Sequence, residues 1–279
     1  MNSRASLLDM QRSWATQHDY RIDPRGYLAS VAENLYQPLS ARALCAFSTG
    51  SGSELLDTTL RPAKMKALHS SAALAVNVFD YWADREPDVL LRALRLEAKP
   101  VSIEFEAQFP TGLGGNPPNL DVAFRYDSDV VVGLESKFSE WLTPKPPNKE
   151  LFKPKYFPES IDLWSSKDLP CCQELATEVH AGRARFRYLD VAQLLKHALG
   201  LATQHQGKFG LSYIFFEWPG SESPVHRAEV ERFQELVGSD FHFVWNSYQE
   251  LYKLLCQAGG PEHVAYTTYL GKRYFHDAV

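Results

Sequence analysis

Two adjacent apolar segments with charged ends constrain the fold of this chain most strongly. Residues 119–138 read NLDVAFRYDSDVVVGLESKF. The segments 120–126 and 130–138 are rich in strand-forming residues, and the polar residues 127–129 between them are typical of a turn. The sequence therefore predicts two neighbouring antiparallel strands joined by a tight turn.

Three charged side chains gather at one end of this predicted hairpin. Pairing the strands about the turn places Asp121 roughly opposite Glu135. Side chains alternate faces along a strand, so Glu135 and Lys137 share a face, about 6–7 Å apart, and Ser136 points to the other. The preceding run 130–134 is apolar, as in a strand buried on both faces. Charges at the end of such a strand are costly unless they bind something, which favours a divalent-metal site for phosphodiester hydrolysis.

A solvated surface ion pair is the alternative for a bare E-x-K sequence. Here an Asp lies on the preceding strand, the strand with E-x-K is of the buried type, and a helix follows. That context favours a catalytic site. None of the nine His lies in an H-E-x-x-H zinc pattern, and no G-x-S-x-G nucleophile elbow is present.

Asp121, followed after thirteen residues by Glu135-Ser136-Lys137, resembles the signature of the PD-(D/E)XK nuclease superfamily. Leu120 stands where that signature often has Pro. Four segments are similar to a largely uncharacterised bacterial branch of restriction-endonuclease-like proteins: GSGSEL at 50–55, HSSAALAVNVF at 69–79, IEFE at 103–106 and ESKFSE at 135–140. The resemblance implies an αβββαβ core and metal-dependent cleavage of nucleic acid.

The resemblance also implies roles for single residues. Asp121 and Glu135, with the carbonyl of Ser136, would coordinate Mg²⁺ or Mn²⁺, and Lys137 would orient the attacking water or stabilise the developing negative charge. Secondary candidates are Glu106 as a further ligand, Glu54 or Glu33 from an early helix, and Gln193, which shares one helical face with Lys196 and His197. Ordinary surface placement is the alternative for each of them.

The order of the remaining elements predicts an α/β fold with a mixed central sheet flanked by helices. We expect one nuclease-like domain, 1–279, with a helical N-terminal part, 1–98, a core, 99–250, and a helical C-terminal part, 251–279. The expected helices are 27–46, 64–82, 189–205 and 225–237, with Ser70 or Ser71 as the N-cap for 72–82. The expected strands besides the hairpin are 101–109, 211–218 and 241–245. The Pro-rich insertion 143–182 is expected to be irregular.

The net charge of −5 gives no general basic footprint for nucleic acid. Two local basic groups remain. Arg183, Arg185 and Arg187 alternate with other residues before a helix, and an extended segment would put all three on one side, where they could meet phosphates. The other group is the lysines of the insertion, Lys145, Lys149, Lys153 and Lys155. A solvated surface is the alternative for both.

No apolar run approaches the ~20 residues of a membrane helix, no signal peptide is evident, and the four Cys lack metal-ligand spacing. We therefore expect a cytoplasmic protein without a membrane partner. The favoured function is a Mg²⁺- or Mn²⁺-dependent endonuclease acting on nucleic acid, DNA in the first place, with a role such as restriction or defence. Paired cuts in a duplex would favour a homodimer. The alternative is a catalytically inactive nuclease fold that serves as a nucleic-acid-binding or scaffold module.

Overall fold

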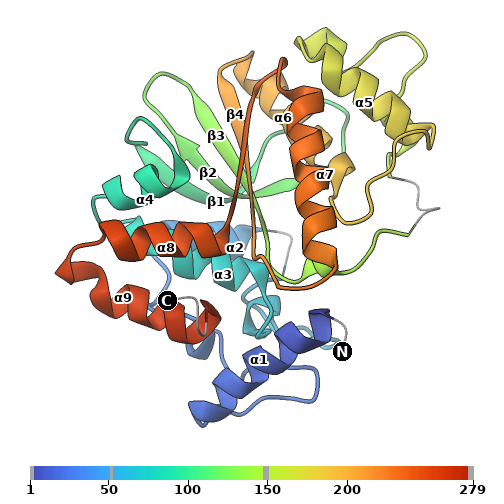
Figure 1. The fold of residues 1–279 in the computed structure, drawn as a ribbon. Coiled ribbons are helices and arrows are strands. Elements are labelled where there is room, and N and C mark those ends of the chain that lie inside the picture. The colour runs from blue at the N-terminus through green and yellow to red at the C-terminus, as the bar shows by residue number, and fades with distance from the viewer. Residues whose placement is uncertain (1–2, 51–52, 147–150, 276–279) are drawn as a thin grey trace.

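A five-stranded sheet forms the centre of the protein in a computed structural model, which describes residues 3–50, 53–146 and 151–275 (Figure 1). The strands are β1 Ser102–Gln108, β2 Asn119–Arg125, β3 Val131–Lys137, β4 Phe209–Phe215 and β5 His242–Ser247. They lie in the order β1-β2-β3-β4-β5. The pairs β1·β2 and β2·β3 are antiparallel, whereas β3·β4 and β4·β5 are parallel. The sheet is therefore mixed, and the predicted α/β class with its restriction-endonuclease-like core is confirmed.

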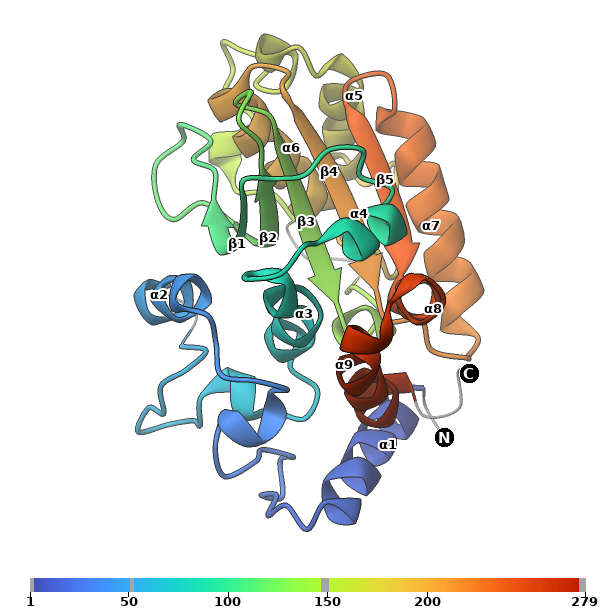
Figure 2. The same ribbon diagram turned by 90° about the vertical axis from the view of Figure 1, so that its left-hand side faces the viewer.

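Helices cover the sheet on two sides. The α-helices are α1 Ser3–Gln17, α2 Ala41–Thr49, α3 Ser71–Phe79, α4 Asp88–Leu94, α5 Pro170–His180, α6 Val191–His205, α7 Glu222–Val237, α8 Tyr248–Ala258 and α9 Val264–Leu270. Figure 2 shows α3, α4 and α8 in front of the sheet and α5 and α6 behind it. Helix α6 packs on β3 and β4, and α3 packs on β2 and β3. None of the described helices is long and apolar enough to cross a membrane.

The core follows from this layering. All seven residues of β4 are buried, as expected for a central parallel strand covered on both faces. In β1 burial alternates instead, and Ile103 and Phe105 are buried while Glu104 lies partly open. One large apolar cluster links the sheet to the N-terminal and C-terminal helices, and a smaller one contains Trp14 and Leu68.

The predicted helix over 27–46 is wrong for residues 27–40 and right only from Ala41 on. Tyr27 pairs with Ala67 in an isolated β-bridge, and α2 begins only at Ala41. Two physical features separate them: Pro38 cannot lie inside a helix, and the Ser40 side chain caps α2 by accepting a hydrogen bond from Ala43.

The predicted helix over 64–82 is divided. A short 3₁₀ turn occupies Lys64–Lys66, and α3 begins at Ser71 because Ser70 caps it by accepting from the Ala73 N–H. The insertion 143–182 is also more ordered than predicted, since it contains α5. That helix starts with Pro170, and Pro is well tolerated in a first helical turn, where its missing N–H has no partner to lose.

Candidate active site

Strands β2 and β3 bring Asp121 next to the E-x-K segment. Val122 lies opposite Leu134 in the antiparallel register, and the same register continued by one residue places Asp121 opposite Glu135. The Ser136 backbone N–H donates a 2.7 Å hydrogen bond to Asp121 Oδ2. The turn between the strands thus determines which carboxylates become neighbours.

Glu135 is almost completely enclosed, with 1% of its surface exposed. Its Oε1 accepts from Lys137 Nζ in an ion pair. Its Oε2 lies 3.0 Å from Nε2 of His197, a side chain of α6 that is equally buried. Neither of these last two atoms has an aligned hydrogen-bond partner among the described residues, so the two atoms are close but not hydrogen-bonded to each other.

The electrostatics of the two carboxylates differ. Burial raises the pKa of Asp121, and the neighbouring Glu135 carboxylate raises it further. Burial also acts to raise the pKa of Glu135, but Lys137 and His197 outweigh it and the pKa is lowered. Burial acts to lower the pKa of Lys137, but Glu135 and Asp121 raise it more. Of the two carboxyl groups, Glu135 is therefore favoured in its ionised form and Asp121 is disfavoured in it.

Asp121 faces a cavity of about 420 Å³. Glu54 and Glu106 also line this cavity, as do Ser70 and Ser71 at the start of α3. Burial raises the pKa of both glutamates. The structure thus brings two of the predicted secondary candidates, from separate parts of the chain, to the same space as Asp121.

Each of these two glutamates also has a local partner. Glu54 forms a 3.2 Å ion pair with Lys64, and Glu106 accepts a hydrogen bond from Asn119. Glu106 has a positive φ of 50°, which is strained for a residue with a side chain. The third acidic candidate, Glu33, accepts from the Ser30 backbone N–H and so stabilises a local turn.

The three candidates on α6 have different surroundings. Gln193 lies one turn before His197, in the first turn of the helix, where its backbone N–H bonds to the Asp190 cap. Lys196 extends toward the insertion, donates a 2.7 Å hydrogen bond to the Leu151 carbonyl and lies over the ring of Phe152. His197 contacts the E-x-K segment through Glu135.

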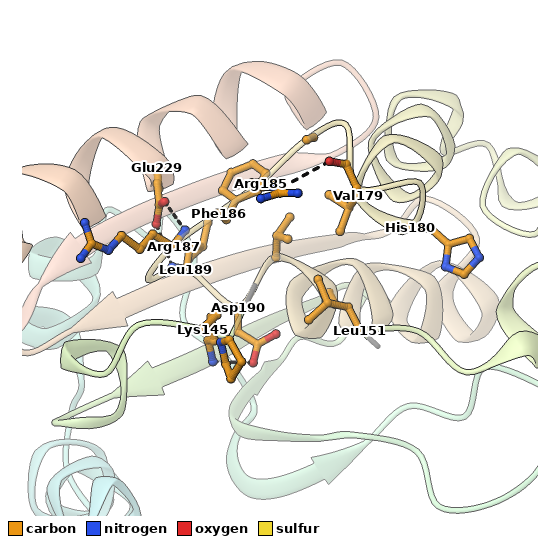
Figure 3. A pocket seen from close by; sticks show the side chains of 15 residues that line it. Lys145, Leu151, Val179, His180, Arg185, Phe186, Arg187, Leu189, Asp190 and Glu229 are labelled. Carbon is orange, nitrogen blue, oxygen red and sulfur yellow. Dashed lines mark hydrogen bonds and ion pairs between the residues drawn. The ribbon is translucent and has the colours of Figure 1, made fainter. Parts of the chain in front are cut away.

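The predicted basic residues lie around a second cavity of about 510 Å³ (Figure 3). Arg185 and Arg187 line it, whereas Arg183 forms a bidentate ion pair with Glu178. None of the described residues that line this cavity lines that of Asp121. The alternating arginines therefore do not form one continuous face beside Asp121.

The lysines of the insertion also have separate partners. Lys145 forms a 2.7 Å ion pair with Asp190 at the second cavity. Lys155 donates a hydrogen bond to the Gly114 carbonyl, and Lys153 is exposed. Lys149 lies outside the described residues.

A family model described as Restriction Endonuclease associating with ARP matches residues 27–275. The chain belongs to this family. The matched range contains the whole sheet, both motif strands and α6. No curated protein and no solved structure matches the chain. The resemblance to restriction-endonuclease-like proteins, seen first in the spacing of Asp121 and E-x-K, is thereby confirmed.

The donor set of this restriction-endonuclease-family site fits a hard divalent cation in part. Asp121 and Glu135 offer carboxylate oxygens, the ligands that Mg²⁺ and Mn²⁺ prefer, and a cation would relieve the repulsion that raises the pKa of Asp121. No group of three or more His, Cys, Asp or Glu side chains is arranged around one point within the described part of the chain. Backbone carbonyls and water would have to complete the coordination, which is usual for Mg²⁺.

Two contacts of the site were not foreseen from the sequence. The His197–Glu135 contact joins residues 62 positions apart, and the Ser136 hydroxyl lies 2.7 Å from the Tyr248 hydroxyl on α8. The sequence placed His197 and Lys196 on one helical face. The packing of α6 then directs His197 toward Glu135 and Lys196 toward the insertion. For Tyr248 no local signal exists, since the residue follows the last strand.

Proposed function

We propose that this protein is a metal-dependent nuclease that hydrolyses phosphodiester bonds of nucleic acid, with DNA as its substrate. One observation carries the proposal: Asp121 accepts a hydrogen bond from the backbone of the E-x-K segment, its carboxylate is repelled by that of Glu135, and Lys137 forms an ion pair with Glu135. Membership of a family described as restriction endonucleases supports it.

The residues of the site have distinct tasks in this proposal. Asp121, Glu135 and the Ser136 carbonyl would hold Mg²⁺ or Mn²⁺. When bound, the metal supplies a Lewis acid for the scissile phosphate and lowers the pKa of a coordinated water. Lys137 fixes the direction of the Glu135 carboxylate and provides positive charge where negative charge develops in the transition state.

The cavity beside Asp121 suits the approach of a phosphate ester. Its walls carry Arg4, Lys64 and His69 as well as the glutamates, so two cationic side chains line the same cavity as Asp121. Burial lowers the pKa of His69, and the nearby Arg4 and Arg12 lower it further, so the neutral imidazole is favoured there.

The test is cleavage of plasmid, linear duplex, single strands, a junction and RNA with Mg²⁺ or Mn²⁺. Lys137→Ala should reduce the rate of cleavage by a factor of about 10² or more, whereas Lys99→Ala, which removes an exposed surface ion pair, should leave it unchanged. Full activity of the Lys137 variant would contradict the role of that lysine. If the wild type cleaved no substrate, the inactive scaffold would be the better description.

Two features of the reaction extend this proposal. The family's description names association with ARP, so we propose that this chain acts with such a partner, and the cleavage assay should include it. Paired cuts in duplex DNA would need two sites, which a symmetric homodimer supplies. Sedimentation of the protein with and without duplex would test the dimer.

A further inference from the structure

His197 reaches the proposed site from a different element than the motif residues. It lies in the middle of α6, is 2% exposed, and places Nε2 3.0 Å from Glu135 Oε2. Neither atom has a hydrogen-bond partner among the described residues, so each is the nearest polar group given for the other. Burying an ionised carboxylate oxygen without a polar neighbour is costly. His197 is therefore the group that makes the buried position of this oxygen tolerable.

Each carboxylate oxygen of Glu135 has a neighbour from a different element. Lys137 of β3 takes Oε1, and His197 of α6 faces Oε2. An ionised carboxylate offers roughly four lone-pair sites. One contact on each oxygen fixes the plane of the group and leaves its remaining lone pairs for a cation.

Close packing of α6 on the sheet sets the position of His197. Gly200, three residues later, lies so near the Phe109 carbonyl oxygen that a Cβ would clash with it. On the face of β3 that packs against α6, a Cβ at Gly133 would come within 2.5 Å of Leu120 Cδ1 and 3.3 Å of Leu201 Cδ1. The absence of side chains at these two glycines allows the helix to approach, so that an imidazole can reach Glu135.

We propose that His197 is a positioning residue that orients the Glu135 carboxylate for metal binding. The inference rests on the proposed function, because it requires that Glu135 be a metal ligand. His197 acts through Glu135 and does not itself need to touch the substrate. Removing such an orienting partner costs 10–100-fold in metal affinity in comparable sites.

Titration calorimetry with Mn²⁺ on the full chain tests the inference. We expect His197→Ala to raise the dissociation constant about 10–100-fold, and His197→Gln, which restores a side-chain N–H donor, to recover most of that loss. His205→Ala is the matched control. His205 is a nearly buried histidine of the same helix whose Nδ1 contacts the Asp129 carbonyl instead, so its loss should leave the dissociation constant unchanged.

An NMR measurement on the wild type covers the case in which the alanine variant does not fold. The His197 imidazole signals, assigned by their loss in His197→Gln, should shift during a Mg²⁺ titration, while those of His205 stay in place. Unchanged His197 signals at saturating Mg²⁺, or equal Mn²⁺ affinity of the folded alanine variant and the wild type, would overturn the inference alone. If the wild type bound neither metal, the proposed function would fail with it.

Discussion

Asp121 and Glu135 are neighbours, yet their carboxylates are stabilised very differently. Glu135 has Lys137 on one oxygen and His197 near the other, and its pKa is lowered despite burial. Asp121 is half-buried and repelled by Glu135, and it accepts a hydrogen bond from the Ser136 N–H. A carboxyl group whose pKa is raised in the folded state destabilises the folded protein when it ionises. In the absence of metal, the ionised Asp121 carboxylate therefore lowers the free energy of unfolding.

Asp121→Asn should make the metal-free protein more stable at pH 7, by about 0.5–2 kcal/mol. The amide oxygen can still accept from the Ser136 N–H, while the repelled charge is gone. The gain in stability over the wild type is largest at pH values above the raised pKa of Asp121. It shrinks as the pH falls toward the ordinary pKa of an aspartate, because the wild-type carboxyl is then protonated in the folded state. Urea denaturation between pH 4 and about pH 8 measures it.

Metal should reverse this order of stability. Saturating Mn²⁺ binds the folded wild type and stabilises it by mass action, whereas the variant has lost a ligand. Asp127→Asn, in the exposed turn of the same hairpin, should change stability by less than about 0.5 kcal/mol under either condition. A metal-free Asp121→Asn protein that is less stable than the wild type would show that the carboxylate is needed for folding.

At the level of elements, the periodicity of apolar residues correctly predicted the helices and strands that bury one regular face. The strands and α6 follow their apolar patterns. The region before α3 does not, because buried asparagines replace regular backbone pairing there. Asn34 donates to the carbonyls of Met65 and Ala67, and Asn77 accepts from the Tyr36 N–H. Such contacts, like His197 on Glu135, exist only after distant segments pack, so periodicity cannot reveal them.

The packing of α6 gives a prediction at this level. Gly200→Ala should destabilise the protein by about 1–3 kcal/mol, because the new Cβ would clash with the backbone carbonyl oxygen of Phe109. A backbone atom cannot move away as a flexible side chain can. The displaced helix carries His197, so Mn²⁺ affinity should fall as well. Gly210→Ala is the control, because its Cβ would lie an ordinary 3.4 Å from the His242 carbonyl oxygen. Thermal unfolding and calorimetry measure the two effects, and unchanged metal affinity in a destabilised Gly200 variant would separate the helix position from the site.

On the scale of the whole molecule, one buried arginine joins the two ends of the described chain. Arg273 is fully buried in the last turn, Gly271–Phe275. It donates to Gln11 of α1, to Asn34 Oδ1 at 2.7 Å and to the Leu68 carbonyl at 2.9 Å. Its guanidinium also lies 4.0 Å from the centre of the Trp14 ring. All three of these acceptors are neutral, and they come from α1, from Asn34 and from Leu68. The hydrogen bonds of this one side chain therefore link the N-terminal and C-terminal regions.

Arg273→Ala should therefore destabilise the protein by about 3 kcal/mol or more, because it leaves a cavity and three acceptors without their donor. Lys272→Ala, which changes the exposed neighbour, should cost less than about 0.5 kcal/mol. Urea denaturation followed by both circular dichroism and Trp fluorescence measures the change. A single transition, shifted equally by both probes, is expected because one apolar cluster contains Leu7 of α1, the sheet residues and Phe275. Two separate transitions would instead show that the terminal regions unfold while the sheet with Asp121 and Glu135 remains, and the chain would then comprise two units rather than the one domain that its sequence predicts.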